Sequence, residues 1–468
     1  MSVSRSTESG RQGGSGQDKD SADEGAKAGQ GLPTIVVVGG GAGGLELATD
    51  LGDHLAARGR ARVILVDMAP THIWKPLLHE VAAGSMDPNT HQLAYAAQAR
   101  WHHFEFQQGA LLGLDRAGKR ILVGAVEGED GLENLPERWI AYDTLVLAIG
   151  SVTNFFGVPG ANENALALDT VAQADRFRRR LISACVRAQS RGAASTDGPR
   201  PTVSIVIIGA GATGVELSAE LRNTAQVLNA YGLHDLDPRR DVRISLIEAG
   251  PRILPALPER VAAGILQLLG KLDVDVLTSE RVVEVTSGEV RMASGKRIPA
   301  ELTVWAAGII APGVLARLDG LTTSRLGQVV VRQTLQTESD PDIFAMGDCA
   351  SCPWPAVGGN VPPRAQAAHQ QARFLGKALR RKLDGKSLPQ FQFRDAGSLV
   401  SLGTFSAVGN LMGGLIGGNV LIEGLVARVM YASLYRMHVS ALLGFWGMVL
   451  DTITHWLRRR TSPRVKLH

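Results

Sequence analysis

Cysteine is scarce in this sequence, which has only three, Cys185, Cys349 and Cys352, among its 468 residues. An odd and sparse count excludes a disulfide framework and favours a reducing compartment such as the cytoplasm. Cys349 and Cys352 form a C-x-x-C pair, a spacing that thiol redox sites and zinc sites both use. The sequence supplies no two further ligands for zinc. We therefore expect no metal site, and a structural role for this pair.

Long apolar runs and a strong excess of charge are also missing. No stretch reaches the ~18 consecutive apolar residues that span a bilayer, and the longest, Ala441–Leu450, is too short. The net charge is only +4, and no array of aromatic and basic residues indicates a nucleic-acid partner. The first 31 residues are rich in Gly, Ser and Gln and lack an apolar centre. We expect a disordered tail over 1–31 rather than a signal peptide.

A hydrophobic content of 45% in a chain of this length predicts two or three folded domains. Strand-like runs at Ile35–Val38, Val63–Asp67 and Thr144–Ile149, the first two separated by a helical stretch, indicate a parallel sheet. The pattern restarts at Val203–Ile208, after a polar stretch at Gln189–Pro201 that we expect to be a linker. We predict an α/β protein in which one Rossmann-like dinucleotide-binding domain (32–160 and 326–393) is interrupted by another (161–325) and followed by a C-terminal region (394–468).

A G-x-G-x-x-G motif, Gly39, Gly41 and Gly44, follows the first strand-like run. The first glycine permits a tight turn, the second lets a pyrophosphate approach the backbone, and the third lets helix and strand pack closely. The pyrophosphate then meets free N–H groups at a helix N-terminus. Asp67 ends the second strand-like run 23 residues after Gly44 (67 − 44). A carboxylate in that place accepts hydrogen bonds from ribose hydroxyls.

The same motif recurs at Gly209, Gly211 and Gly214, with Glu248 at the end of its second strand-like run. The interval is longer, 34 residues (248 − 214), because Arg222–Asp241 adds an excursion. The Glu248 carboxylate would repel a 2′-phosphate, which favours NADH over NADPH. Two complete sites predict an electron donor held beside an electron carrier, and a flavin is a natural carrier because it accepts a hydride and passes electrons on.

With these motifs, the chain closely resembles the type II NADH dehydrogenases, the non-pumping NADH:quinone oxidoreductases of respiratory membranes. The resemblance runs from about Thr34 to His468. Its most specific stretches are HIWKPLLHEVAAGSMD, YDTLVLAIGSVTNFFGVPG, EAGPRILPALP, GDCASCP, PPRAQAAHQ and YASLYRMH. The resemblance implies a glutathione-reductase-like fold, non-covalent FAD, NADH as substrate and a quinone as acceptor. It also implies a peripheral location at the cytoplasmic face of the membrane, compatible with a homodimer.

The resemblance further assigns residues to the two nucleotides. Those expected around FAD are Gly39, Gly41, Gly43, Gly44, Asp67, Lys75, His79, Ala110, Asp348, Ala365 and Gln366. Those expected around NADH are Gly209, Gly211, Gly214, Glu248 and Gly308. Asp348 belongs to DPDIFAMGD, a late strand that returns to the flavin in such proteins and would there bond the ribityl chain.

Three polar residues are the candidates for chemistry. Gln366 and Gln370 match the AQxAxQ motif, which in the family lines the flavin and quinone pocket. Neutral amide donors suit quinone carbonyls at the mouth of an apolar tunnel, although solvated glutamines on a helix give the same pattern. Glu216 follows Gly214 by two residues and is expected to pass protons or position the nicotinamide. The alternative is a carboxylate that merely favours a helix N-terminus.

The C-terminal region has an apolar pattern at helical spacing. Its apolar residues are Leu442, Leu443, Trp446, Val449, Leu450, Ile453, Trp456 and Leu457. Asp451 and His455 interrupt them, and a basic end follows, formed by Arg458, Arg459, Arg460, Arg464 and Lys466. We expect an amphipathic helical region that binds an anionic membrane surface. The alternative is a helix pair packed on the core or on another subunit.

Two other functions are compatible with parts of this pattern. A sulfide:quinone oxidoreductase uses two widely separated cysteines near its flavin, and Cys185 and Cys349 are widely separated. Such an enzyme has no use for an intact NADH site, which this sequence retains. A disulfide reductase of this fold has C-x4-C in its first helical region, where THIWKPLLHE has no cysteine. The remaining alternative is a flavoprotein that senses NADH without turnover.

Overall fold

The computed structural model describes residues 31–194, 202–230, 237–402, 407–413, 418–423 and 425–458. A five-stranded parallel sheet forms the first half of the fold, in the spatial order β22-β11-β1-β2-β5. Its strands are β1 (Thr34–Val38), β2 (Arg62–Asp67), β5 (Glu105–Gln108), β11 (Thr144–Leu147) and β22 (Ile343–Ala345). The Val, Ile and Leu side chains of β1 and β11 are buried on both faces, as expected for a parallel sheet covered on both sides.

A second parallel sheet is formed by residues that lie between β11 and β22 in the chain. Its spatial order is β15-β14-β13-β19. The strands are β13 (Val203–Ile208), β14 (Val242–Ile247), β15 (Val274–Leu277) and β19 (Leu302–Trp305). Because β22 returns to the first sheet only after this second one is complete, the prediction of one Rossmann-like domain inserted in another is confirmed.

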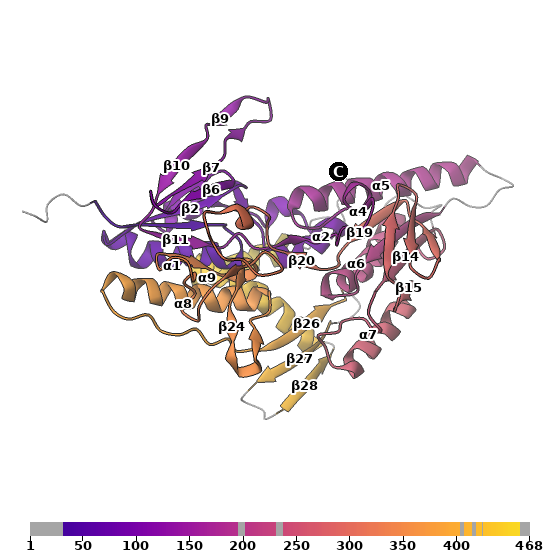
Figure 1. The fold of residues 1–468 in the computed structure, drawn as a ribbon. Coiled ribbons are helices and arrows are strands. Elements are labelled where there is room, and N and C mark those ends of the chain that lie inside the picture. The colour runs from indigo at the N-terminus through magenta and orange to yellow at the C-terminus, as the bar shows by residue number, and fades with distance from the viewer. Residues whose placement is uncertain are drawn as a thin grey trace, which may run out of the picture.

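Helices and small sheets complete the two halves (Figure 1). In the first half, α1 (Ala42–His54) packs against α8 (Ala365–Leu383), and α3 (Tyr95–Trp101) packs against β5. The second half contains α4 (Ala161–Asn164), α6 (Ala212–Ala230) and α7 (Glu259–Lys271). One three-stranded antiparallel sheet is formed by β6 (Leu111–Asp115), β7 (Arg120–Val123) and β10 (Arg138–Ala141), and another by β16 (Val282–Val285), β17 (Glu289–Met292) and β18 (Arg297–Pro299). Two antiparallel pairs are β8 (Val126–Glu127) with β9 (Glu133–Leu135) and β24 (Pro353–Trp354) with β25 (Gly359–Asn360). The pair β21 (Val329–Val330) and β23 (Ala350–Ser351) is parallel.

Short elements join the two halves. The antiparallel pair β12 (Val152–Thr153) and β20 (Ile309–Ile310) marks the two crossings of the chain. The small helix α2 (Leu78–Ala83) of the first half packs against both α5 (Val171–Ala194) and α6 of the second. This contact brings the THIWKPLLHE stretch of the first half against the helix that follows the second glycine motif.

The expected linker at Gln189–Pro201 is wrong for its first part. Residues up to Ala194 form the last turns of α5, whose side chains Phe177, Leu181, Ala184 and Cys185 are buried. Alanine and arginine in this stretch are good helix formers, so the small polar residues extend an amphipathic helix rather than break it. Residues 195–201, like the tail at 1–30, lie outside the described residues.

The C-terminal region contains a small sheet and one long helix. The strands β26 (Gly397–Ser401), β27 (Ala407–Gly413) and β28 (Gly418–Glu423) pair antiparallel. In Figure 1 this sheet, coloured yellow, lies beside α7, and it contacts α6 and α7 of the inserted domain. The helix α9 (Leu425–Arg458) contacts both this sheet and α1 of the first domain. The C-terminal region therefore connects both nucleotide domains.

One segment of α9, Tyr435–Thr454, is long and apolar enough to cross a membrane by length and composition. A count of consecutive apolar residues does not find this segment, because Arg436, His438 and Asp451 interrupt the apolar run although the average hydropathy stays high. Gly444 has non-helical backbone angles (φ 71°, ψ 173°) and interrupts the segment. Backbone groups freed by such a break need partners that lipid does not supply.

Candidate functional site

The two glycine motifs form turns of the same geometry at the carboxyl ends of β1 and β13. Gly39 and Gly209 both have φ of 102°, a left-handed value that favours glycine. Each donates its N–H at 2.7 Å to the carbonyl of the neighbouring strand's end, Val66 in one case and Ile247 in the other. Both turns lead directly into a helix, α1 or α6, whose N-terminus faces the end of its sheet. This is the arrangement expected at a dinucleotide pyrophosphate.

The space around these glycines fits that use. A Cβ on Gly44 would overlap the carbonyl oxygen of Gly39, and a Cβ on Gly214 would overlap that of Gly209, so strand and helix are in closest contact there. By contrast, a Cβ on Gly41 or Gly211 would meet nothing within 4 Å. The backbone at the second glycine of each motif is therefore open, which is what the approach of a phosphate requires.

Each turn is closed by the predicted carboxylate. Asp67 accepts the N–H of Gly40 at 2.6 Å and that of Ala69 at 2.8 Å. Glu248 accepts the N–H of Ala210 at 2.8 Å and that of Gly250 at 2.7 Å. Burial raises the pKa of Asp67, while its two N–H donors act in the opposite direction. Both acids thus bind the residue that follows the first glycine of their motif, Gly40 or Ala210, as expected for the nucleotide sites that the sequence predicts.

Four further residues assigned to the nucleotides lie in loops or helices of the same two domains. Ala110 follows β5 next to the end of β2, and its carbonyl accepts the N–H of Gly124 at 2.8 Å. Gly43 packs against Met346 and Ala368, so it allows α1 to approach α8. Asp348 follows β22, accepts the Ser151 hydroxyl at 2.8 Å, and has its pKa raised by burial. Gly308 has φ of 67° and leaves room for the ring of Phe156.

Lys75, His79 and Glu216 lie where the two domains meet. The Lys75 ammonium donates to the Ser151 carbonyl at 2.8 Å and pairs with Asp169 at 2.9 Å. The Glu216 carboxylate is buried, accepts the N–H of Ser401 at 3.0 Å, and has an oxygen 3.7 Å from Nδ1 of His79. The N–H at Nδ1 of His79 also donates to the Pro76 carbonyl at 2.9 Å. Burial lowers the pKa of His79 to about 4, so this ring is neutral at pH 7.

Gln366 and Gln370 lie on the first two turns of α8, which begins at Ala365. The Gln366 amide donates to the Asp395 carboxylate at 3.0 Å and accepts the N–H of Ala396 at 3.2 Å. The Gln370 amide donates to the Arg394 carbonyl at 2.8 Å and accepts its N–H at 3.0 Å. Both amides therefore fix the backbone segment that leads into β26.

Sequence reasoning missed a cluster on the other side of the first glycine turn. His72, the second residue of β3 (Thr71–His72), which pairs with β4 (Leu93–Ala94), bonds to His438 of α9 through the two Nε2 atoms at 2.8 Å. His72 also bonds to the Gly40 carbonyl at 2.9 Å, and Tyr95 donates to the same carbonyl at 2.7 Å. The stretches HIWKPLLHE and YASLYRMH both stood out in the sequence, but nothing local indicates that their histidines meet.

The cysteines are free and buried, as the structural interpretation of C-x-x-C requires. Burial raises the pKa of Cys185 to about 12, of Cys349 to about 11 and of Cys352 to about 12. Cys185 packs in a different hydrophobic cluster from Cys349, so the two do not meet. Among the described residues, no group of three or more His, Cys, Asp or Glu side chains could hold a metal ion.

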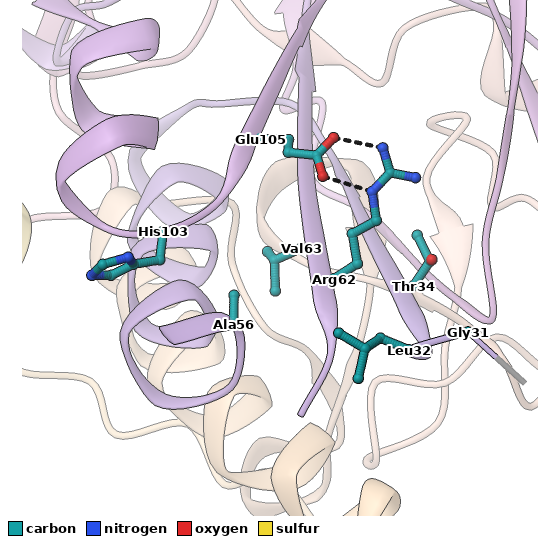
Figure 2. Close-up of a pocket in the computed structure, with 8 residues that line it drawn as sticks. All are labelled: Gly31, Leu32, Thr34, Ala56, Arg62, Val63, His103 and Glu105. Carbon is teal, nitrogen blue, oxygen red and sulfur yellow. Dashed lines mark hydrogen bonds and ion pairs between the residues drawn. The ribbon is translucent and has the colours of Figure 1, made fainter. Parts of the chain in front are cut away.

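A wide hollow of about 570 Å³ lies away from all of these residues (Figure 2). It is lined by Thr34 at the start of β1 and by Arg62 and Glu105, which form two hydrogen bonds of 2.6 Å. Ligands of open parallel sheets bind at the carboxyl ends of the strands, where the glycine turns lie. This hollow is at the amino ends and is therefore no candidate for the nucleotides.

Comparison with known proteins decides the family. Residues 33–372 match the family model described as pyridine nucleotide-disulphide oxidoreductase. The chain is 40% identical over 446 residues to the type II NADH:quinone oxidoreductase of Haemophilus influenzae, which covers 93% of this chain and 100% of the relative. This chain belongs to the type II NADH:quinone oxidoreductases.

Two solved structures have a fold similar to that of this chain. NDH2 from Plasmodium falciparum in complex with NADH has a TM-score of 0.75 at 17% identity, covering 93% of this chain and 99% of that one. The sulfide:quinone oxidoreductase from Aquifex aeolicus has a TM-score of 0.67 at 18% identity, covering 88% of this chain and 92% of that one. Similarities at these identities show a shared fold.

Proposed function

We propose that this protein transfers a hydride from NADH to bound FAD and then two electrons to a membrane quinone. The duplicated glycine turn supports this proposal most strongly. Each of the two turns has free space at its second glycine and donates backbone N–H groups to a carboxylate of its own. The two turns belong to two domains that are in contact through α2 and α6. FAD supplies a carrier that takes a hydride from one reactant and passes electrons to another. FAD, which stays bound, occupies the first glycine turn, and NADH, which binds and leaves in each cycle, occupies the second.

The residues of the second turn act on NADH. The free space at the Gly211 backbone would receive the pyrophosphate, and Glu248 would accept hydrogen bonds from the ribose hydroxyls. Glu248 also selects against NADPH, because its negative charge repels a 2′-phosphate. Gly308, between β19 and β20, leaves room for the ring of Phe156, and we assign this position to the nicotinamide side of the site.

The residues of the first turn and its surroundings act on FAD. The open backbone at Gly41, where no side chain caps α1, would hold the pyrophosphate, while Gly39 and Gly44 shape the turn and the close contact of strand and helix. Asp67 would hold the ribose, and Asp348 would hold the ribityl chain. Lys75 fixes the crossing between the domains through its contacts with Ser151 and Asp169 and would lie near the flavin.

Glu216 and the two glutamines act on the proton and the quinone. Glu216 is buried 3.7 Å from the neutral ring of His79. A proton taken up by either side chain would therefore leave no buried positive charge without a carboxylate beside it. Gln366 and Gln370 hold the segment at 394–397, and we assign them to the wall of the quinone site that this segment forms.

The quinone reaches this site from a membrane surface bound by α9. After the break at Gly444, α9 exposes Phe445 (62%), Trp446 (75%) and Leu450 (65%), and these large apolar side chains suit the interfacial zone of a bilayer. The basic end beyond Arg458, outside the described residues, is assigned to anionic headgroups. The three free thiols favour the cytoplasmic face, and the same region is compatible with a homodimer.

Sedimentation with vesicles tests the membrane assignment. Wild-type protein is expected to bind vesicles that contain anionic lipid, more weakly as salt increases, and a Trp446→Ser, Leu450→Ser variant is expected to lose about tenfold in affinity while keeping its flavin. The matched control is Leu266→Ser, since Leu266 is an exposed leucine on α7 of the inserted domain. Equal binding by all three proteins would contradict the assignment.

A steady-state assay separates this function from the two alternatives. A variant with all three cysteines changed to alanine is expected to keep NADH:quinone turnover within a factor of about two, because the buried thiols are protonated and Cys185 does not meet Cys349. Turnover with sulfide that collapses in this variant would favour the sulfide:quinone oxidoreductase. Binding of NADH without any quinone reduction would favour the sensor.

A further inference from the structure

The buried pair His72 and His438 joins the C-terminal helix to the first glycine turn. The two residues lie 366 positions apart, in β3 and α9, and their Nε2 atoms are 2.8 Å from each other. The ring of Trp74 stacks on that of His438, with centroids 5.9 Å apart and an interplanar angle of 19°. Both imidazoles are buried, and a narrow cavity of about 30 Å³ lies beside them. Two buried imidazoles in contact need a defined arrangement of protons.

The partners of His72 define that arrangement. The Gly40 carbonyl can only accept, so Nδ1 of His72 carries a hydrogen and donates to it. Burial lowers the pKa of His72 to about 4 and that of His438 to about 3, so both rings are neutral at pH 7. Nε2 of His72 is then an acceptor, and Nε2 of His438 must donate. The hydrogen bonds therefore run in one direction, from His438 through His72 to the Gly40 carbonyl.

Gly40 is held from every side by such contacts. Its N–H donates to Asp67 at 2.6 Å, and its carbonyl accepts from Tyr95 at 2.7 Å as well as from His72. The Tyr95 ring leaves no room for a Cβ on Gly40. The carbonyl of Gly40 and the N–H of Gly41 belong to one planar trans peptide and point in opposite directions. Fixing the carbonyl on the histidine side therefore turns the Gly41 N–H toward the open side of the turn.

We propose that His438 is a positioning residue of the FAD site: through His72 it orients the Gly40–Gly41 peptide so that its N–H faces the cofactor's pyrophosphate. Docking of α9 and retention of FAD are then coupled, and each strengthens the other by the same factor. The proposal rests on the proposed function only in that FAD occupies the first glycine turn. It gives the membrane-facing helix a second role, in holding the cofactor of the domain on which it packs.

The test compares two changes at His438. His438→Leu removes the donor and is expected to speed the release of FAD about tenfold, measured as recovery of flavin fluorescence after dilution. His438→Gln keeps an N–H donor and is expected to remain within about threefold of the wild type. The matched control is Val439→Ala, which loosens the buried neighbour on α9 without touching the hydrogen bonds and should lower the Tm without changing the release rate.

Release of FAD from His438→Leu at the wild-type rate would overturn the proposal, and so would equal release from the Leu and Gln variants. If His438→Leu does not fold, hydrogen exchange of residues 435–443 in the wild type answers the question, with slower exchange expected when FAD is bound. Equal exchange with and without FAD would overturn the coupling. A wild-type protein that binds no FAD at all would instead contradict the proposed function itself.

Discussion

The buried carboxylate of Glu216 accepts the backbone N–H of Ser401 at 3.0 Å, across 185 residues of sequence. One carboxylate of the inserted domain thus fixes the first strand of the C-terminal sheet, while His79 of the first domain lies 3.7 Å away on its other oxygen. Three parts of the chain meet at this group. Glu216 therefore joins the inserted domain to both the first domain and the C-terminal sheet.

Glu216→Gln tests the chemical part of this arrangement. The amide oxygen can still accept the Ser401 N–H, so folding and FAD content should be retained while the exchangeable proton is lost. We expect kcat for quinone reduction to fall about 100-fold, the usual range for removal of a general acid or base. One limb of the pH–rate profile should disappear with it. The control is Glu220→Gln on the same helix, whose carboxylate binds Asn223. An unchanged profile would contradict a proton role.

Gly211→Ala tests whether the open space at the second motif is the NADH pyrophosphate site. A Cβ there meets no protein atom within 4 Å, so stability should be unaffected. The methyl group would occupy the place of the phosphate, and we expect the KM for NADH to rise at least about tenfold with FAD content unchanged. Gly264→Ala on α7, also free of contacts, is the control and should leave KM unaltered. Equal KM values in both variants would place NADH elsewhere.

Glu248→Gln tests the preference between the two nicotinamide nucleotides. The neutral side chain keeps one acceptor for the turn but no longer repels a 2′-phosphate, an interaction of about 1–4 kcal/mol between unit charges 4 Å apart. We expect the ratio of kcat/KM for NADH over NADPH to fall about tenfold. Glu280→Gln, which changes a carboxylate that accepts the Ser294 hydroxyl beyond the neighbouring strand β15, should not change the ratio. A ratio that stays constant in Glu248→Gln would refute the selective role.

Gln370→Ala separates the quinone step from the NADH step. Loss of the two hydrogen bonds to Arg394 frees the segment before β26, so we expect the KM for quinone to rise about tenfold. The rate of flavin reduction by NADH in a stopped-flow experiment should stay the same. Arg373→Ala, an exposed change on the same helix, serves as the control. Slower reduction by NADH with an unchanged quinone KM would contradict the assignment.

Acid is expected to destabilise the protein between pH 6.5 and about 4. The pKa values of His72 and His79 are lowered to about 4 and that of His438 to about 3, so the unfolded chain binds more protons than the folded one in this range. Stability is therefore fully present above pH 6.5 and is lost as the pH falls. Each histidine contributes a slope of up to about 1.4 kcal/mol per pH unit. Urea unfolding at pH 7.5, 6 and 5 measures it, and a free energy of unfolding that increases on acidification would contradict the burial of these rings.

The nucleotide turns could be predicted from the sequence because their physics is local. A run such as IVVVGGGAGG specifies a strand, a left-handed glycine and a helix start within a few residues, and the acid at the end of the next strand is brought beside it by parallel pairing. The positions of Asp67 and Glu248 follow from that pairing alone. The inserted order of the two domains follows from the same repeat.

The contacts of the C-terminal region could not be predicted in the same way. His72 and His438 meet only because α9 packs beside β3, and no periodicity in either segment specifies a partner 366 residues away. The amides of Gln366 and Gln370 match a motif, but their direction is set by the backbone at 394–397. Gly444 reads as an ordinary residue of an apolar helix, yet it interrupts that helix.

An anaerobic titration of the purified protein tests the central claim, that two dinucleotides meet in this chain, most directly. We expect flavin absorbance at about one FAD per chain, complete bleaching by one equivalent of NADH, and full recovery on addition of one equivalent of a short-chain quinone. A colourless protein that takes up no flavin, or a flavin that NADH bleaches but quinone does not restore, would contradict it.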